Sequence, residues 1–160
     1  MKPLVSREIV EETVGVFNAA SPEELDGLRA KCGPFQEEVT AFVIVYTEGL
    51  PNRERALVLA VYALMVEAFR RSGATFRRVR SGEVIHAWKS SAAFVRDLRS
   101  GRPAPATAEP EVLLLVLDML LGENDPAGLD AEAAPFVAVR VLKTAADCVH
   151  RAGVLPAARR

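Results

Sequence analysis

Cysteine is scarce in this chain of 160 residues, which contains only Cys32 and Cys148. The two lie far apart and form no CxxC pair, so a disulfide framework is excluded as the basis of the fold. We expect two small buried thiols in a reducing compartment, and therefore a cytoplasmic protein. The opening stretch, MKPLVSREIVEET, turns acidic before any apolar run of signal length, which predicts no export signal.

The sequence also lacks a hydrophobic run long enough to cross a membrane. Its most apolar window is ALVLAVYALMVEAF, residues 56–69, in which thirteen of fourteen residues are apolar. A membrane span needs about 20 such residues, and arginines close this window on both sides. We predict a buried core helix here. The net charge of −1 gives no general attraction to membranes or nucleic acids.

Strand signals are rare, whereas helix boundaries are frequent. Ser21 followed by Pro22 predicts a helix start, and Gly33 is expected to end that helix in the left-handed conformation. FVIVY, residues 42–46, is the one segment for which a strand remains an alternative to a helix. Seven helices are predicted, at about 3–18, 22–32, 34–48, 53–72, 82–100, 110–121 and 130–152.

These helices predict an all-α fold, a bundle of about seven helices in a single domain covering residues 1–160. Residues 101–110, GRPAPATAEP, form an internal proline-rich loop, and 154–160 form a frayed tail. Asp130 is expected to cap the last helix, and Pro135 either kinks it or marks its true start.

Two of the predicted helices, 56–69 and 111–122, are apolar on nearly all sides. Such a helix must be wrapped by others. One domain of this size has room for one or two central helices, and the alternative is that a second copy of the chain covers one face. We therefore expect a homodimer.

The stretches EPEVLLLVLDMLLG and PFVAVRVLKTAADCV resemble a loose set of uncharacterised prokaryotic all-helical proteins of unknown function. In those proteins an apolar helix that begins with proline follows a linker and precedes a final long helix. The resemblance covers roughly the last 50 residues, is weaker over 50–100, and rests on the apolar pattern. It implies an all-helical fold and carries no activity and no site residues.

The acidic residues and both histidines follow the ligand order of ferritin-like di-metal bundles, with two aspartates in place of glutamates. The set is Glu67, Glu83-x-x-His86, Asp118 and Asp147-x-x-His150. Two geometric arguments oppose a metal site. Alternating helix directions put Asp147 and His150 about 20 Å from the others. The expected inward stripe on helix 82–100, namely Ile85, Trp88, Ala92 and Val95, turns Glu83 and His86 toward solvent.

The simpler interpretation of Glu67 is an ion pair with Arg70 and Arg71, three and four residues further along the same helix. The sequence contains no nucleophile elbow, P-loop, GxGxxG or HExxH motif. We predict no catalytic residue, no metal ligand and no cofactor, with Glu67, Glu83, His86 and Asp118 kept as a remote metal-binding alternative.

Positive charge is concentrated in the middle of the chain. Residues 51–104 carry eleven basic and four acidic side chains, whereas residues 1–50 carry four and nine. The stretch FRRSGATFRRVRSG, residues 69–82, contains five arginines and no acid. The guanidinium group of arginine can donate two parallel hydrogen bonds to a phosphate or carboxylate. Arg77, Arg78 and Arg80 are therefore candidate anion-binding residues.

The alternative is that these arginines form a solvated loop whose positive charge is balanced by acidic residues of the same or a neighbouring chain. We prefer a non-catalytic protein that self-associates and binds an unidentified protein partner. A module that binds phosphate or nucleic acid through Arg70–Arg80 is second, and a metal-dependent enzyme is third. No membrane partner is expected.

Overall fold

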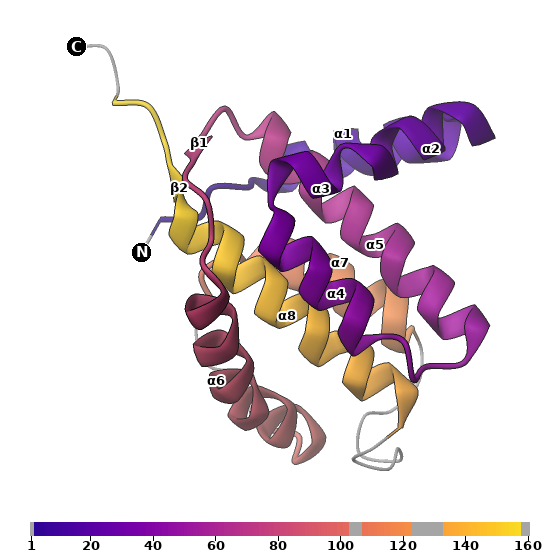
Figure 1. Cartoon of the computed structure of the whole chain (residues 1–160), viewed down its shortest axis with the longest axis vertical. Helices are drawn as coiled ribbons and strands as arrows, with labels where there is room; N and C mark the ends of the chain where they lie inside the picture. Colours follow the sequence, from indigo (N-terminus) through magenta and orange to yellow (C-terminus); the bar gives the residue numbers. More distant parts are fainter. Residues whose placement is uncertain (1, 103–106, 123–132, 158–160) are drawn as a thin grey trace.

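Helices form nearly all of the regular structure in the computed structural model, which describes residues 2–102, 107–122 and 133–157 (Figure 1). In chain order the elements are α1 (Arg7–Ala19), α2 (Pro22–Ala30), α3 (Cys32–Phe35), α4 (Glu37–Tyr46), α5 (Asn52–Arg71), β1 (Thr75–Phe76), α6 (Ser81–Arg99), α7 (Pro110–Leu121), α8 (Ala134–Ala152) and β2 (Gly153–Val154). The predicted all-α bundle is confirmed: these ranges hold seven helices of nine residues or more and the short α3.

Serine side chains begin the first two helices. The Ser21 hydroxyl accepts a hydrogen bond from the Glu24 amide at 3.2 Å, which confirms the predicted helix start. The Ser6 hydroxyl accepts one from the Ile9 amide at 3.2 Å, so α1 begins at Arg7 and not near residue 3. The preceding Leu4 and Val5 lie outside the helix and are buried in the core.

The predicted helix 34–48 is broken at Gln36. This residue is extended, with φ −149° and ψ 93°, and it separates α3 from α4. Gly33 lies inside α3 and does not adopt a positive φ, so its expected role as a left-handed helix end is wrong. Residues 42–46 are helical, which excludes the strand alternative.

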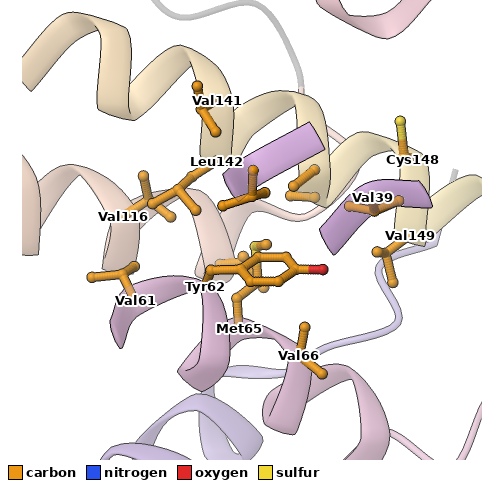
Figure 2. Packing of buried hydrophobic residues seen from close by; sticks show 14 of the residues in the cluster. Val39, Val61, Tyr62, Met65, Val66, Val116, Val141, Leu142, Cys148 and Val149 are labelled. Carbon is orange, nitrogen blue, oxygen red and sulfur yellow. The ribbon is translucent and has the colours of Figure 1, made fainter. Parts of the chain in front are cut away.

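The core is built around α5 and α8. Residues 61–69 of α5 are all buried, so the window 56–69 contains the predicted core helix. Helix α8 packs against α4, α5, α6 and α7, and it buries residues on every side. Valines and leucines from α4, α5, α7 and α8 interlock around Tyr62 and Met65 (Figure 2). None of the helices in the described ranges is long and apolar enough to cross a membrane.

Helix α7 is not enclosed in this way, although its sequence is apolar almost throughout. Leu114 is 59% exposed and Met119 is also exposed, so this helix is not wrapped on all sides within one chain, and a second copy over its exposed face stays a prediction. The central position belongs to α8, which begins at Ala134 with Pro135 in its first turn. The predicted cap Asp130 and part of the predicted loop 101–110 lie outside the described residues.

A buried carboxylate, Glu109, ties the N-terminal segment to the far end of α8. Its oxygens accept hydrogen bonds from the Leu4 amide at 2.7 Å and the Val5 amide at 3.1 Å. Its Oε1 also lies 2.6 Å from Nδ1 of His150, and both side chains are buried. Since buried polar groups are stabilised only when they find hydrogen-bond partners, this cluster fixes residues 4 and 5 against the core.

We predict that Glu109→Ala lowers the free energy of unfolding by about 3–5 kcal/mol, because it leaves buried donors without an acceptor. Urea unfolding followed by circular dichroism measures this loss. Glu111→Ala, two residues further along at a half-exposed position, is the matched control, with an expected loss below about 1 kcal/mol. Equal losses in the two variants would contradict a structural role for the Glu109 cluster.

Candidate functional site

The arginine segment, residues 77–80, is held in an extended conformation before α6. Thr75 and Phe76 of β1 pair antiparallel with Val154 and Gly153 of β2, and the Arg77 amide then donates to the carbonyl of Ala152 at 2.9 Å. The Val79 side chain is buried in the core. With the backbone anchored in this way, the arginines on either side of Val79 are turned outward.

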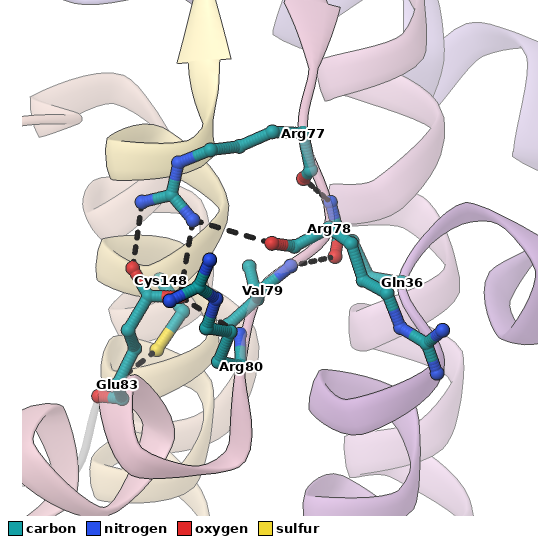
Figure 3. A network of polar contacts seen from close by, with 7 residues as sticks. All are labelled: Gln36, Arg77, Arg78, Val79, Arg80, Glu83 and Cys148. Carbon is teal, nitrogen blue, oxygen red and sulfur yellow. Dashed lines mark hydrogen bonds and ion pairs between the residues drawn. The ribbon is translucent and has the colours of Figure 1, made fainter.

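The side-chain amide of Gln36 completes this anchoring from the opposite side (Figure 3). Its Nε2 donates to the carbonyl of Arg77 at 2.8 Å, and its Oε1 accepts from the amide of Val79 at 3.0 Å. Gln36 therefore takes the place that a neighbouring strand would occupy, and it is almost completely buried. This role explains the break between α3 and α4, because an extended Gln36 directs its amide toward the arginine segment.

The structure brings Arg77, Arg78 and Arg80 together but pairs two of them with acids of the same chain. Arg77 forms a two-pronged pair with Glu83 at 2.6 and 3.0 Å, and Arg78 reaches Glu37 at 2.8 Å. The Arg80 guanidinium has no carboxylate within ion-pair distance in the part of the chain that the structure describes. All three line an open cavity of about 790 Å³.

The other two arginines of the stretch lie elsewhere. Arg70 and Arg71 contact the buried Glu67 at 3.0 and 3.2 Å at the C-terminal end of α5, as the sequence predicts. They do not line the cavity with Arg77 and Arg80.

Glu83 occupies the place at the start of α6 where an external anion would otherwise sit. The hydrogen bonds from Arg77 and, to a lesser extent, from the Arg80 amide at 2.7 Å lower the pKa of this carboxyl to about 2. The same pair raises the pKa of Arg77. Glu83 is therefore ionised at neutral pH, and a phosphate at this helix start would have to displace it.

A groove between α4 and α6 continues from this cavity. It encloses about 220 Å³, and Glu38 and Ser81 line both hollows. The α4–α6 groove is otherwise lined by apolar and aromatic side chains, namely Ala41, Phe42, Val45, Tyr46, Val84, Ile85 and Trp88. Val45 is 56% exposed and Ile85 is 53% exposed. Apolar side chains of this size, gathered at one opening, mark a surface suited to binding.

The sequence did not predict this groove, because the expected inward face of α6 is wrong. The side chains that α6 buries are Val84, Ala87, Ser91 and Phe94, whereas Ile85 and Ala92 are exposed. Ala87 and Ser91 are small and let α6 lie close against α8, which turns the helix by about one residue, or 100°. Small residues at i and i+4 are the sequence signal that could have indicated this face.

Trp88 forms the inner end of the groove and is half-buried. Its ring meets Phe42 and Tyr46 edge-on, with centroids 5.7 and 4.9 Å away. Arg140 of α8 stacks beneath it, 3.6 Å from the ring centroid, and its Nη2 donates to the Trp88 carbonyl at 2.8 Å. This stacking fixes the indole and places a positive charge below the apolar surface.

Arg140 is the second guanidinium near the groove with no carboxylate partner among the described residues. Its Nε donates to the hydroxyl of Ser91 at 3.0 Å, so its fixed partners are neutral oxygen atoms. Burial lowers its pKa, as expected for a cation removed from water. The groove therefore has positive charge beneath it at Arg140 and beyond its open end at Arg80.

The remote metal-binding set is dispersed in the structure. Glu67 and Glu83 are each paired with arginine, and His86 and Asp118 are exposed. Asp147 pairs with Lys143, while His150 contacts Glu109. The described ranges contain no cluster of three or more His, Cys, Asp or Glu side chains that could hold a metal ion.

Both cysteines are buried and free. Burial raises the pKa of Cys32 to about 11 and that of Cys148 to about 12. Each is therefore a protonated thiol at neutral pH, without the thiolate that nucleophilic chemistry requires.

We predict that Gln36→Ala lowers the free energy of unfolding by about 2–3 kcal/mol, because it leaves a buried amide and carbonyl of the arginine segment without partners. Hydrogen exchange at the Val79 amide should accelerate at the same time. Glu37→Ala, which removes only the exposed pair with Arg78, should cost less than about 1 kcal/mol. Unchanged exchange at Val79 in Gln36→Ala would contradict the anchoring role.

We predict that Glu83→Gln destabilises the protein by about 1 kcal/mol at pH 7, allowing for solvent screening of a partly exposed pair. The pKa of Glu83 is lowered from 4.5 to about 2, so the stabilisation is complete above pH 4.5 and disappears as the pH falls through 2. Urea unfolding of both proteins should show their difference shrinking between pH 5 and pH 2. A difference that stays constant over this range would refute the assignment.

Comparisons with known proteins assign no function to this arrangement. No family model, no curated protein sequence and no solved structure matches the chain.

Proposed function

We propose that this protein is a non-catalytic, cytoplasmic interaction module that binds a helical segment of a polypeptide in the α4–α6 groove. The segment has an apolar face and carries acidic side chains. The observation that supports this most directly is the exposure of Val45 and Ile85 over Trp88, beside two guanidinium groups that have no carboxylate partner among the described residues.

The apolar part of the recognition follows from the shape and composition of the groove. Two helices form its walls, and α8 packs under both. An amphipathic helix laid between them would bury side chains at i, i+3 or i+4, and i+7. Trp88, Tyr46 and Arg140 belong to the residue types that contribute most to binding energy at protein interfaces. Trp88 is already fixed by Arg140, so little side-chain entropy is lost on binding.

The preference for acidic side chains follows from the positive charge near the groove. Gln36 bonds to the arginine segment directly before α6, so α4 and α6 begin side by side at the same end of the groove (Figure 1). The positive ends of both helix dipoles therefore lie at that end, together with Arg80. Arg140 adds a positive charge below the groove. Glu38 also lines this end of the groove, so the attraction of an acidic segment rests on Arg80, Arg140 and the two helix ends together outweighing that one carboxylate.

Phosphate or nucleic-acid binding remains the second candidate, because Arg77, Arg78 and Arg80 line one cavity. Glu83 and Glu37 already occupy two of these arginines. A protein segment that uses Arg80 and the apolar groove needs neither pair to break, and for that reason we prefer it.

Trp88 is the only tryptophan of the chain and lines the groove, so its fluorescence reports binding directly. The probe is a synthetic amphipathic helical peptide with leucine on one face and glutamate toward its C-terminal end. We predict a saturable change in Trp88 emission with this peptide, and a much weaker response when lysine replaces glutamate. Ile85→Glu should weaken binding about tenfold or more.

The matched control is Ile44→Glu, on α4 at a position that is 41% exposed but does not line the groove. It should bind the acidic peptide like the wild type. Equal loss in the two variants, or no response to the acidic peptide, would refute the proposed function. A response to a single-stranded oligonucleotide that disappears in Arg80→Glu, with none to the peptide, would favour the second candidate instead.

A further inference from the structure

Helix α7 carries an exposed face with the chemistry that the α4–α6 groove would accept. Leu114 is the most exposed leucine of the described chain, and Met119 is also exposed. Asp118 is exposed and Glu111 is half-exposed. The helix, PEVLLLVLDMLL, contains these two acids and no basic residue.

These side chains share one face. At 100° per residue, Leu114 and Asp118 lie one turn apart, Leu115 and Met119 lie one turn apart beside them, and Glu111 falls between the two rows. The exposed face is therefore an apolar surface with acidic residues in its middle. Leu114 and Met119 supply the apolar contacts that the proposed function requires, and Asp118, near the C-terminal end of the helix, supplies the acidic side chain.

The groove of the same chain cannot receive this face. Helix α7 packs against α8, α5 and α1, whereas α4 and α6 pack against α8 and against each other. In Figure 1, α7 lies behind α8, and α4 lies in front of it. Since α8 separates the two surfaces, the face of α7 and the groove can meet only between two molecules.

We infer that the exposed face of α7 in one copy of this chain binds in the α4–α6 groove of another. This inference rests on the proposed function and names the partner. The helix enters antiparallel to α4 and α6. Its negative C-terminal end, with Asp118, then lies at the end of the groove where Arg80 and the positive helix ends are found.

Other pairings of the same surfaces are less favourable. Two α7 faces packed against each other would bring Asp118 and Glu111 close to their own copies, which like charge opposes. Two grooves facing each other would leave both hollows unfilled. The favoured contact therefore joins different surfaces, and it leaves one free groove and one free α7 face on each pair. Such a head-to-tail contact extends into a ring or a chain of copies rather than stopping at a symmetric dimer.

Sedimentation velocity over a series of protein concentrations tests this inference. The wild type should form species larger than a dimer as its concentration rises, and added salt should weaken them. Leu114→Glu and Ile85→Glu should each prevent this growth, because each removes one of the two surfaces. Both positions are more than half exposed, so circular dichroism should show unchanged folding. Ile44→Glu should assemble like the wild type.

Mixing the two blocked variants gives the decisive result. Leu114→Glu retains an intact groove and Ile85→Glu retains an intact α7 face, so a head-to-tail contact predicts a 1:1 complex between proteins that are monomeric alone. Adding Asp118→Lys to the Ile85→Glu variant, which supplies the α7 face, should weaken that complex at low salt. If the mixture contains only monomers, the inference is wrong.

The outcome also separates this inference from the proposed function. A wild type that stays monomeric at every concentration, but still shows the Trp88 response to the acidic peptide, would overturn self-association and leave the groove as a site for another protein. Loss of the peptide response as well would overturn both.

Discussion

The buried side-chain amide of Gln36 positions both walls of the groove. By bonding to the backbone at Arg77 and Val79 it ends α3, begins α4 and fixes the approach to α6. The two helices therefore begin side by side, and their dipoles add at one end. The exposure of Val45 and Ile85, the order of Trp88 and the outward direction of the arginines all depend on this placement. An amide suits the role because it donates and accepts at once, as a strand neighbour does.

Much of the helical framework could be predicted from the sequence, because its signals are local. The Ser21 cap, proline in the first turns at Pro22 and Pro110, and the apolar window 56–69 act over a few residues, and the structure bears them out. The break at Gln36 could not be predicted, since its cause is a contact with residues more than forty positions away. The rotation of α6 was missed for a related reason. Large apolar residues suggested one face, but the small residues Ala87 and Ser91 decide which face approaches α8.

The site was predictable only in part. The clustering of Arg77, Arg78 and Arg80 is visible in the sequence, and so is the pairing of Glu67 with Arg70 and Arg71. The groove is not visible there, because it depends on the orientation of two separate helices. Of the two helices predicted to be central, α5 is buried as expected, whereas α7 keeps an exposed face and α8 shares the centre with α5. The charged residues of α8 find local partners, as Arg140 does at Trp88 and Lys143 does at Asp147, so charge does not keep that helix at the surface.

The contacts around residues 150–154 determine which parts of the fold form last. The Glu109 cluster needs His150, and β1 can pair only when Gly153 and Val154 are present. Both connections span long stretches of sequence, and contacts of this kind form late because a large loop must close first. On the ribosome, the arginine segment and the groove beside it therefore take their final form only after nearly the whole described chain has emerged. A nascent chain therefore cannot present a finished groove until residues 150–154 have emerged.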